Sequence, residues 1–168
     1  MNHGLAVKRG EMIRKLIGGL KRLEYRGYDS AGIAIDSTVQ SQCADSTTDI
    51  AEIEVIKASG KVAALEELAS AAANQDAEFL NSSGIAHTRW ATHGPPSPVN
   101  AHPHMSDPDN TFVVIHNGIL TNYRELRQLL TSKGCVFVSE TDTETIAVLI
   151  KHIYDTEIKA NRQPTFIE

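Results

Sequence analysis

Three short stretches of this sequence combine polar, aromatic and glycine residues next to apolar runs that predict buried strands. They cover residues 26–30 (RGYDS), 87–94 (HTRWATHG) and 116–118 (HNG). Polar groups at the ends of buried strands can be aimed into one pocket, so these stretches form a candidate binding or catalytic site. The Asn117-Gly118 pair is also common in tight turns, and its residue types alone leave that simpler role open.

Two charged residues give a more specific chemical signal. Arg89 could bind a carboxylate through its guanidinium and Asp142 could bind an ammonium group, so together they would suit an amino acid. Two structural roles stay open from the residues alone: a salt bridge, or a helix cap formed by Asp142 at the start of the last predicted helix. Trp90, beside Arg89, is more typical of a core or lid anchor than of a catalytic group.

Histidines raise the question of a metal site, because neutral imidazoles bind zinc and similar ions. The candidates are His87, His93, His102 and His104. The sequence has neither a helical H-E-x-x-H pattern nor a C-x-x-C pair, and the proline between the last two histidines need not bring their rings together. A metal site is therefore not predicted.

The elements that would position these residues mix helices and strands along the chain, with no internal repeat. The polar segment 36–51 predicts a surface loop, and the proline-rich segment 90–108 predicts a loop of the kind that carries binding sites. Apolar spacing predicts helices over 11–24, 61–73, 121–133 (opened by Thr and Asn caps) and 143–154, and strands over 31–35, 53–57, 84–89, 111–116 and 136–138.

Composition limits the classes of partner. A formal net charge of -5 supplies no basic field to attract nucleic acid or an anionic membrane. No apolar run has the length needed to cross a bilayer, and the first residues do not build a secretion signal, so we expect a soluble, cytoplasmic protein with small-molecule or protein partners. Cys43 and Cys135 are too few for a disulfide framework and are expected to be free thiols.

Four blocks of the sequence, in this order, resemble the glutaminase domain of the glutamine–fructose-6-phosphate aminotransferase family. The resemblance implies a type 2 glutamine amidotransferase domain with the N-terminal-nucleophile hydrolase fold, an α+β, four-layer αββα sandwich. In that family glutamine is hydrolysed, and ammonia passes to a separate sugar-phosphate isomerase domain that binds fructose 6-phosphate and forms glucosamine 6-phosphate for the hexosamine pathway. The blocks are residues 23–35 (LEYRGYDSAGIAI), 84–104 (GIAHTRWATHGPPSPVNAHPH), 114–126 (VIHNGILTNYREL) and 139–147 (SETDTETIA).

The resemblance implies substrate-binding roles for single residues. Arg89 resembles the group that holds the α-carboxylate of glutamine, and Asp142 resembles the anchor of its α-ammonium group. Asn117 and the backbone N–H of Gly118 resemble the oxyanion hole, which donates to the oxygen that becomes negative when the amide is attacked. This chemistry requires no organic cofactor and no metal, so none is expected.

Other positions match supporting parts of the family's site. Thr92 and His93 lie in the stretch that resembles a loop closing over bound glutamine, and Trp90 resembles the residue that gates the passage of ammonia. Arg26 and Gly27 match a turn that helps to position the nucleophile. The parent protein is expected to be a homo-oligomer.

The chain departs from the family at the nucleophile. Family members begin with a cysteine whose thiol attacks the amide and whose α-amino group acts as the base, whereas residue 2 here is Asn2. We therefore expect residues 1–168 to be a partial glutaminase domain, incomplete at both ends, without the isomerase domain and inactive alone. The alternatives are a non-catalytic glutamine-binding or regulatory module, a glutaminase domain of another type 2 amidotransferase, and, least favoured, a metal-dependent hydrolase.

Overall fold

The structure, a computed structural model, describes residues 7–36, 52–72, 74–79, 83–91 and 94–162. The predicted loop 36–51 lies outside the described residues apart from its first residue, and so do Thr92 and His93. The elements in chain order are β1 (Val7–Lys8), α1 (Arg9–Leu23), the 3-10 turn η1 (Glu24–Arg26), β2 (Ser30–Asp36), β3 (Ile53–Ser59), α2 (Val62–Ala71), β4 (Glu78–Phe79), β5 (Gly84–Arg89), β6 (His104–Met105), β7 (Val113–Val114), α3 (Tyr123–Ser132) and α4 (Thr143–Lys159).

The largest sheet is antiparallel, with β2 between β3 and β5. Ile33 lies opposite Ile56 on one side and Ala86 on the other, and the neighbouring Gly32 lies opposite Lys57 and His87. Because successive side chains of a strand point to opposite faces, the Ile33 row and the Gly32 row face away from each other. The sheet therefore has an apolar first face and a polar second face.

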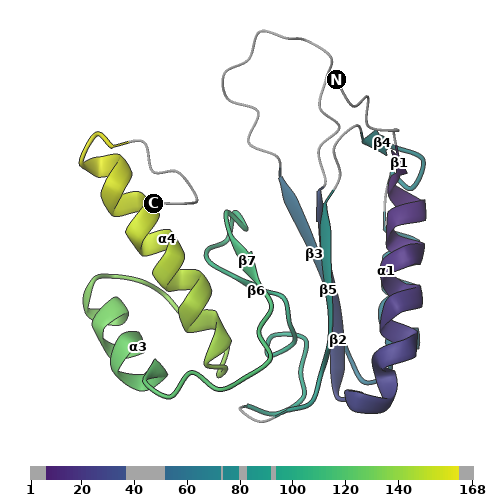
Figure 1. Cartoon of the computed structure of the whole chain (residues 1–168), viewed down its shortest axis with the longest axis horizontal. Helices are drawn as coiled ribbons and strands as arrows, with labels where there is room; N and C mark the ends of the chain where they lie inside the picture. Colours follow the sequence, from purple (N-terminus) through teal and green to yellow (C-terminus); the bar gives the residue numbers. More distant parts are fainter. Residues whose placement is uncertain (1–6, 37–51, 73, 80–82, 92–93, 163–168) are drawn as a thin grey trace, which may run out of the picture.

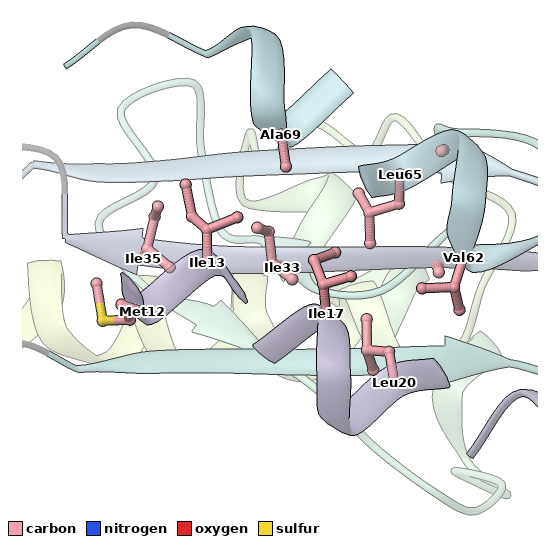
Figure 2. Close-up of a cluster of buried hydrophobic side chains, with 11 residues drawn as sticks. Met12, Ile13, Ile17, Leu20, Ile33, Ile35, Val62, Leu65 and Ala69 are labelled. Carbon is pink, nitrogen blue, oxygen red and sulfur yellow. The ribbon is translucent and has the colours of Figure 1, made fainter. Parts of the chain in front are cut away.

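Helices α1 and α2 cover the first face and form the hydrophobic core (Figure 2). The apolar stripe of α1 follows from the helical spacing of its residues, and β2 offers a run of small and branched apolar side chains. Fully burying one such branched side chain contributes about 1.5–3 kcal/mol. The buried members of the core are Met12, Ile13, Ile17, Leu20, Ala31, Ile33, Ile35, Ala58, Val62, Leu65 and Ala69.

The second face is covered by the segment that contains His102 and His104. Its backbone approaches β2 so closely that a Cβ atom at Gly32 would overlap the carbonyl oxygen of His102. Glycine is required at position 32 for this reason, and not for its conformational freedom. Lys57 holds the same segment, since its Nζ donates to the carbonyl oxygens of Val99 (3.3 Å) and Pro103 (3.2 Å).

This segment leads into the hairpin β6–β7, and beyond the hairpin lie helices α4 and α3 (Figure 1). Helix α4 packs against both β6 and β7, and α3 packs against α4. From α1 to α4 the described elements thus lie in the order helix, sheet, sheet, helix, as expected for the α+β fold. No helix in this part of the chain is long and apolar enough to cross a membrane.

Three predicted details are wrong. The predicted strand 136–138 is absent, because the backbone N–H groups of Val138 and Ser139 donate to the carboxylate of Glu144 and pair with no strand. The predicted strand 111–116 is reduced to β7. Helix α3 begins at Tyr123, and the side chain of its N-cap residue, Asn122, makes no capping hydrogen bond.

Candidate active site

One cavity of about 600 Å³ lies between the end of β5 and the segments 115–118 and 141–143. Its wall also includes residues of η1 and of the second face of the sheet. Six of the nine predicted site residues line this cavity, although they come from four separate parts of the chain. They are Arg26, Arg89, Trp90, Asn117, Gly118 and Asp142.

Arg89 is the last residue of β5 and is only 3% exposed. Its guanidinium donates to the carbonyl oxygens of Gly94 (Nη2, 3.1 Å) and Pro95 (Nη1, 3.4 Å). Burial lowers the pKa of Arg89, while the negative charges of Asp29 and Asp142 raise it. Because the intrinsic pKa of arginine is so high, the group stays protonated and places a positive charge in the cavity wall.

Asp142 is 4% exposed and lies where α4 begins. Its side chain forms no capping hydrogen bond with α4, so the predicted cap role is wrong; Oδ2 accepts a hydrogen bond from the backbone N–H of Leu120 (2.7 Å). Residues next to Asp142 hold the first turn of α4. The N–H of Glu144 donates to Oγ1 of Thr141 (3.4 Å), and the Glu144 carboxylate accepts the N–H of Ser139 (2.9 Å). Thr141 and Glu144 have the T-x-x-E spacing of a capping box, but the Glu144 carboxylate accepts from Val138 and Ser139, while the N–H of Thr141 donates to Oγ of Ser139. Asp142 lines the cavity.

Asn117 and Gly118 follow β7 and do not form a hairpin turn. Oδ1 of Asn117 lies 2.9 Å from Nε2 of His87. A Cβ atom at Gly118 would lie 2.8 Å from Nε2 of His116, the far end of a half-buried side chain. Both Asn117 and Gly118 line the cavity.

Three of the four predicted histidines form a buried stack on the second face of the sheet. The ring centroids of His87 and His102 are 4.4 Å apart, and those of His102 and His104 are 4.7 Å apart. Each Nε2 contacts a different residue of the cavity wall: Asn117 Oδ1 for His87, Thr143 Oγ1 for His102 (3.1 Å) and Thr141 Oγ1 for His104 (2.9 Å). The stack therefore anchors both loop segments of the cavity to the sheet.

These rings are neutral near pH 7. Burial, together with the neighbouring positive and imidazole groups, lowers the pKa of His102 to about 2 and that of His104 to about 3. The described residues contain no group of three His, Cys, Asp or Glu side chains that could hold a metal ion. His93, the fourth predicted histidine, lies outside the described residues.

Of the remaining predicted residues, Trp90 lines the cavity and Gly27 is not among its lining residues. Trp90 is 61% exposed, and its ring lies 6.0 Å from that of Tyr28. Gly27 packs against β5, where a Cβ atom would come within 2.9 Å of the Thr88 carbonyl oxygen. Asp29 lies in the polar stretch 26–30 that the sequence singles out, without a predicted role of its own; its Oδ2 accepts the backbone N–H of Ala91 (2.7 Å) and so holds the chain just after Arg89.

Comparison with known proteins assigns this site to a class. Residues 87–163 match the family model described as a glutamine amidotransferase domain. The solved structure of glutamine phosphoribosylpyrophosphate amidotransferase from B. subtilis superimposes with a TM-score of 0.57 and 26% identity, covering 83% of this chain and 26% of that one. The family match and the fold therefore define a glutamine amidotransferase domain of the N-terminal-nucleophile type.

Closer relatives identify the branch. The chain is 51% identical over 168 residues to glutamine–fructose-6-phosphate aminotransferase from Saccharomyces cerevisiae, covering 99% of this chain and 22% of that protein. It is 54% identical over 157 residues to glutamine–fructose-6-phosphate aminotransferase 2 from Homo sapiens, covering 92% of this chain and 22% of that protein. The chain belongs to the glutamine–fructose-6-phosphate aminotransferase family and spans about a fifth of the length of these relatives.

Proposed function

We propose that the cavity binds L-glutamine. The observation that carries this proposal is the presence of a buried guanidinium, Arg89, and a buried carboxylate, Asp142, in the wall of one cavity. An amino acid supplies the opposite pair, an α-carboxylate and an α-ammonium group. Such charge-assisted hydrogen bonds are roughly twice as strong as neutral ones, which would offset the cost of desolvating the zwitterion.

The side chain of glutamine would then reach Asn117 and Gly118. When a thiol attacks the amide carbon, its oxygen becomes negative, and the Nδ2–H of Asn117 and the backbone N–H of Gly118 would stabilise that charge. Trp90, at the rim, would cover the bound substrate and gate the ammonia that leaves, while Arg26 and Gly27 would support the nucleophile's turn. Thr92 and His93 are proposed to belong to the closing loop.

For the whole protein, we propose the reaction named in its relatives. Ammonia released in this domain would be transferred to fructose 6-phosphate in a separate isomerase domain, giving glucosamine 6-phosphate and glutamate. Residues 1–168 would then be part of the glutaminase domain of a cytoplasmic homo-oligomer.

A second candidate, a glutamine-binding module without hydrolysis, is favoured by one observation. The described residues of the cavity wall include no cysteine, and Cys135 contacts His152 instead (Sγ to Nδ1, 3.9 Å). Binding and hydrolysis therefore have to be measured separately.

The test is calorimetric titration of the chain with L-glutamine, beside an assay of glutamate release. Arg89→Lys keeps the positive charge but loses the bidentate hydrogen bonding of the guanidinium. Asp142→Asn keeps the shape of the side chain but loses its negative charge. Each variant is expected to weaken glutamine binding at least about tenfold. Arg14→Lys, on the exposed side of α1, is the matched control and should leave binding unchanged. Absence of glutamine binding by the unchanged chain would refute the proposal, and glutamate release would decide between the two candidates.

A further inference from the structure

The amide of Asn117 can serve an oxyanion only in one of its two orientations. Its Nδ2 carries the two hydrogens and its Oδ1 carries none, so the amide nitrogen has to face the substrate. The two orientations are nearly equal in shape, and a neighbouring group has to distinguish them. In this structure that neighbour is His87, whose Nε2 lies 2.9 Å from Oδ1 of Asn117.

The buried environment of His87 decides which ring nitrogen carries the proton. His87 is 8% exposed, and within the described residues its Nδ1 is buried without a hydrogen-bond partner. A buried N–H without an acceptor is rarer and costlier than an unused lone pair. Burial also lowers the pKa of His87, so the ring is neutral and has one proton to place. That proton belongs on Nε2.

A proton on Nε2 makes His87 the donor and Oδ1 of Asn117 the acceptor. The two N–H groups of the Asn117 amide are thereby turned away from His87, and Asn117 lines the cavity. The donor itself cannot shift easily, because His87 lies in β5 opposite Gly32 and its ring packs 4.4 Å from that of His102. A rigid strand thus controls the orientation of an amide on a loop.

We propose that His87 is a positioning residue, which fixes the Asn117 amide so that its N–H groups face the side-chain carbonyl of glutamine. The proposal rests on the proposed function of the cavity. In this proposal His87 acts through Asn117, and both residues line the cavity. Its removal should therefore affect recognition of the glutamine side chain and spare recognition of the α-groups by Arg89 and Asp142.

Two ligands separate these contributions. L-Glutamine presents the α-groups and the side-chain amide, whereas L-norvaline presents the same α-groups on a propyl side chain. His87→Leu removes the donor to Asn117, and His87→Gln is the conservative variant, because its amide N–H can take the place of the Nε2–H. We would measure the affinity of each ligand for the unchanged full chain, both variants and Asn117→Ala, with thermal unfolding of each to verify folding.

We expect His87→Leu to weaken glutamine binding about tenfold, the effect of one hydrogen bond, and to leave norvaline binding unchanged. His87→Gln should retain most of the glutamine affinity, and adding His87→Leu to Asn117→Ala should cause no further loss. An equal loss for both ligands, or no loss for either, would overturn the proposal. If the unchanged chain binds neither ligand, the proposed function fails and this inference fails with it.

A measurement without ligand tests the premise directly. Nitrogen-15 chemical shifts of the His87 ring distinguish a protonated Nε2 from a protonated Nδ1. A protonated Nε2 near pH 7 is the expected result. A proton on Nδ1 would turn Asn117 around and overturn the proposal even if glutamine binds.

Discussion

Replacing Gly32 by alanine tests the close packing on which the site depends. Gly32 lies in β2, on the second face, and an added Cβ would overlap the carbonyl oxygen of His102. The same Cβ would lie 3.1 Å from the carbonyl oxygen of Ile56 and 3.1 Å from Cγ of Lys57, so the strand cannot simply move sideways. The segment that carries His102 has to move outward.

The magnitude follows from what that movement disturbs. Adding atoms to a well-packed interior typically costs about 1–3 kcal/mol. Here the obstacle is backbone held by Lys57, which donates to Pro103, and by the His102–Thr143 hydrogen bond, so a value of about 3 kcal/mol is expected. For a chain of this length that corresponds to a decrease of about 6–12 °C in the midpoint of thermal unfolding.

The assay is urea unfolding followed by circular dichroism, with Gly19→Ala as the matched control. Gly19 lies within α1, and a Cβ there meets no atom within 4 Å, so alanine should stabilise the chain by about 0.5–1 kcal/mol through its higher helix propensity. The same methyl group is thus expected to act in opposite directions at the two positions. A free energy of unfolding for Gly32→Ala within about 0.5 kcal/mol of the unchanged chain would refute the packing argument.

Two further predictions concern buried polar groups. Because the pKa values of His102 and His104 are about 2 and 3 when folded and near 6.5 when unfolded, the unfolded state binds more protons below pH 6.5. The free energy of unfolding should be highest above pH 6.5 and decrease below it by about 2–3 kcal/mol per pH unit. In His104→Gln the decrease should be less steep. Equal free energies of unfolding at pH 7 and pH 5.5 would contradict this prediction. Glu144→Gln removes the charged acceptor of two backbone N–H groups and should cost about 1–3 kcal/mol in urea unfolding, whereas Glu67→Gln, on the exposed side of α2, should be neutral.

Elements with a clear apolar period could be predicted from the sequence, and those set by distant contacts could not. The stripe of α1 and the short apolar run of β2 both appear where the pattern places them, and β5 has the predicted bounds, 84–89. The segment 136–138 looks like a strand because Val136 and Val138 favour one. In the structure both side chains are largely exposed, and the N–H of Val138 donates to the Glu144 carboxylate in place of a neighbouring strand.

The site, like the fold, could be predicted only as far as it does not depend on contacts between distant parts of the chain. Residue types suggested amino-acid recognition by Arg89 and Asp142, and the two residues do line one cavity. Residue types raised the question of a metal site at the histidines and did not predict one, but they could not show where each ring nitrogen points. Only the packing of the His102 segment over Gly32 reveals that the Nε2 atoms contact three different partners.

Burial and charge on the second face together favour neutral histidines as these partners. Burial is the main cause that lowers the pKa of His102 and His104, and the positive charges of the buried Arg89 and the half-buried Lys57 lower it further. A further buried cation beside Lys57 and Arg89 would be costly. A neutral imidazole is a rigid group whose N–H can donate a hydrogen bond to a loop residue. Neutrality leaves one proton per ring, and the unpartnered Nδ1 of His87 assigns that proton to Nε2. Burial, with a smaller contribution from these cations, thus keeps the rings neutral, and a neutral ring can orient the amide of Asn117.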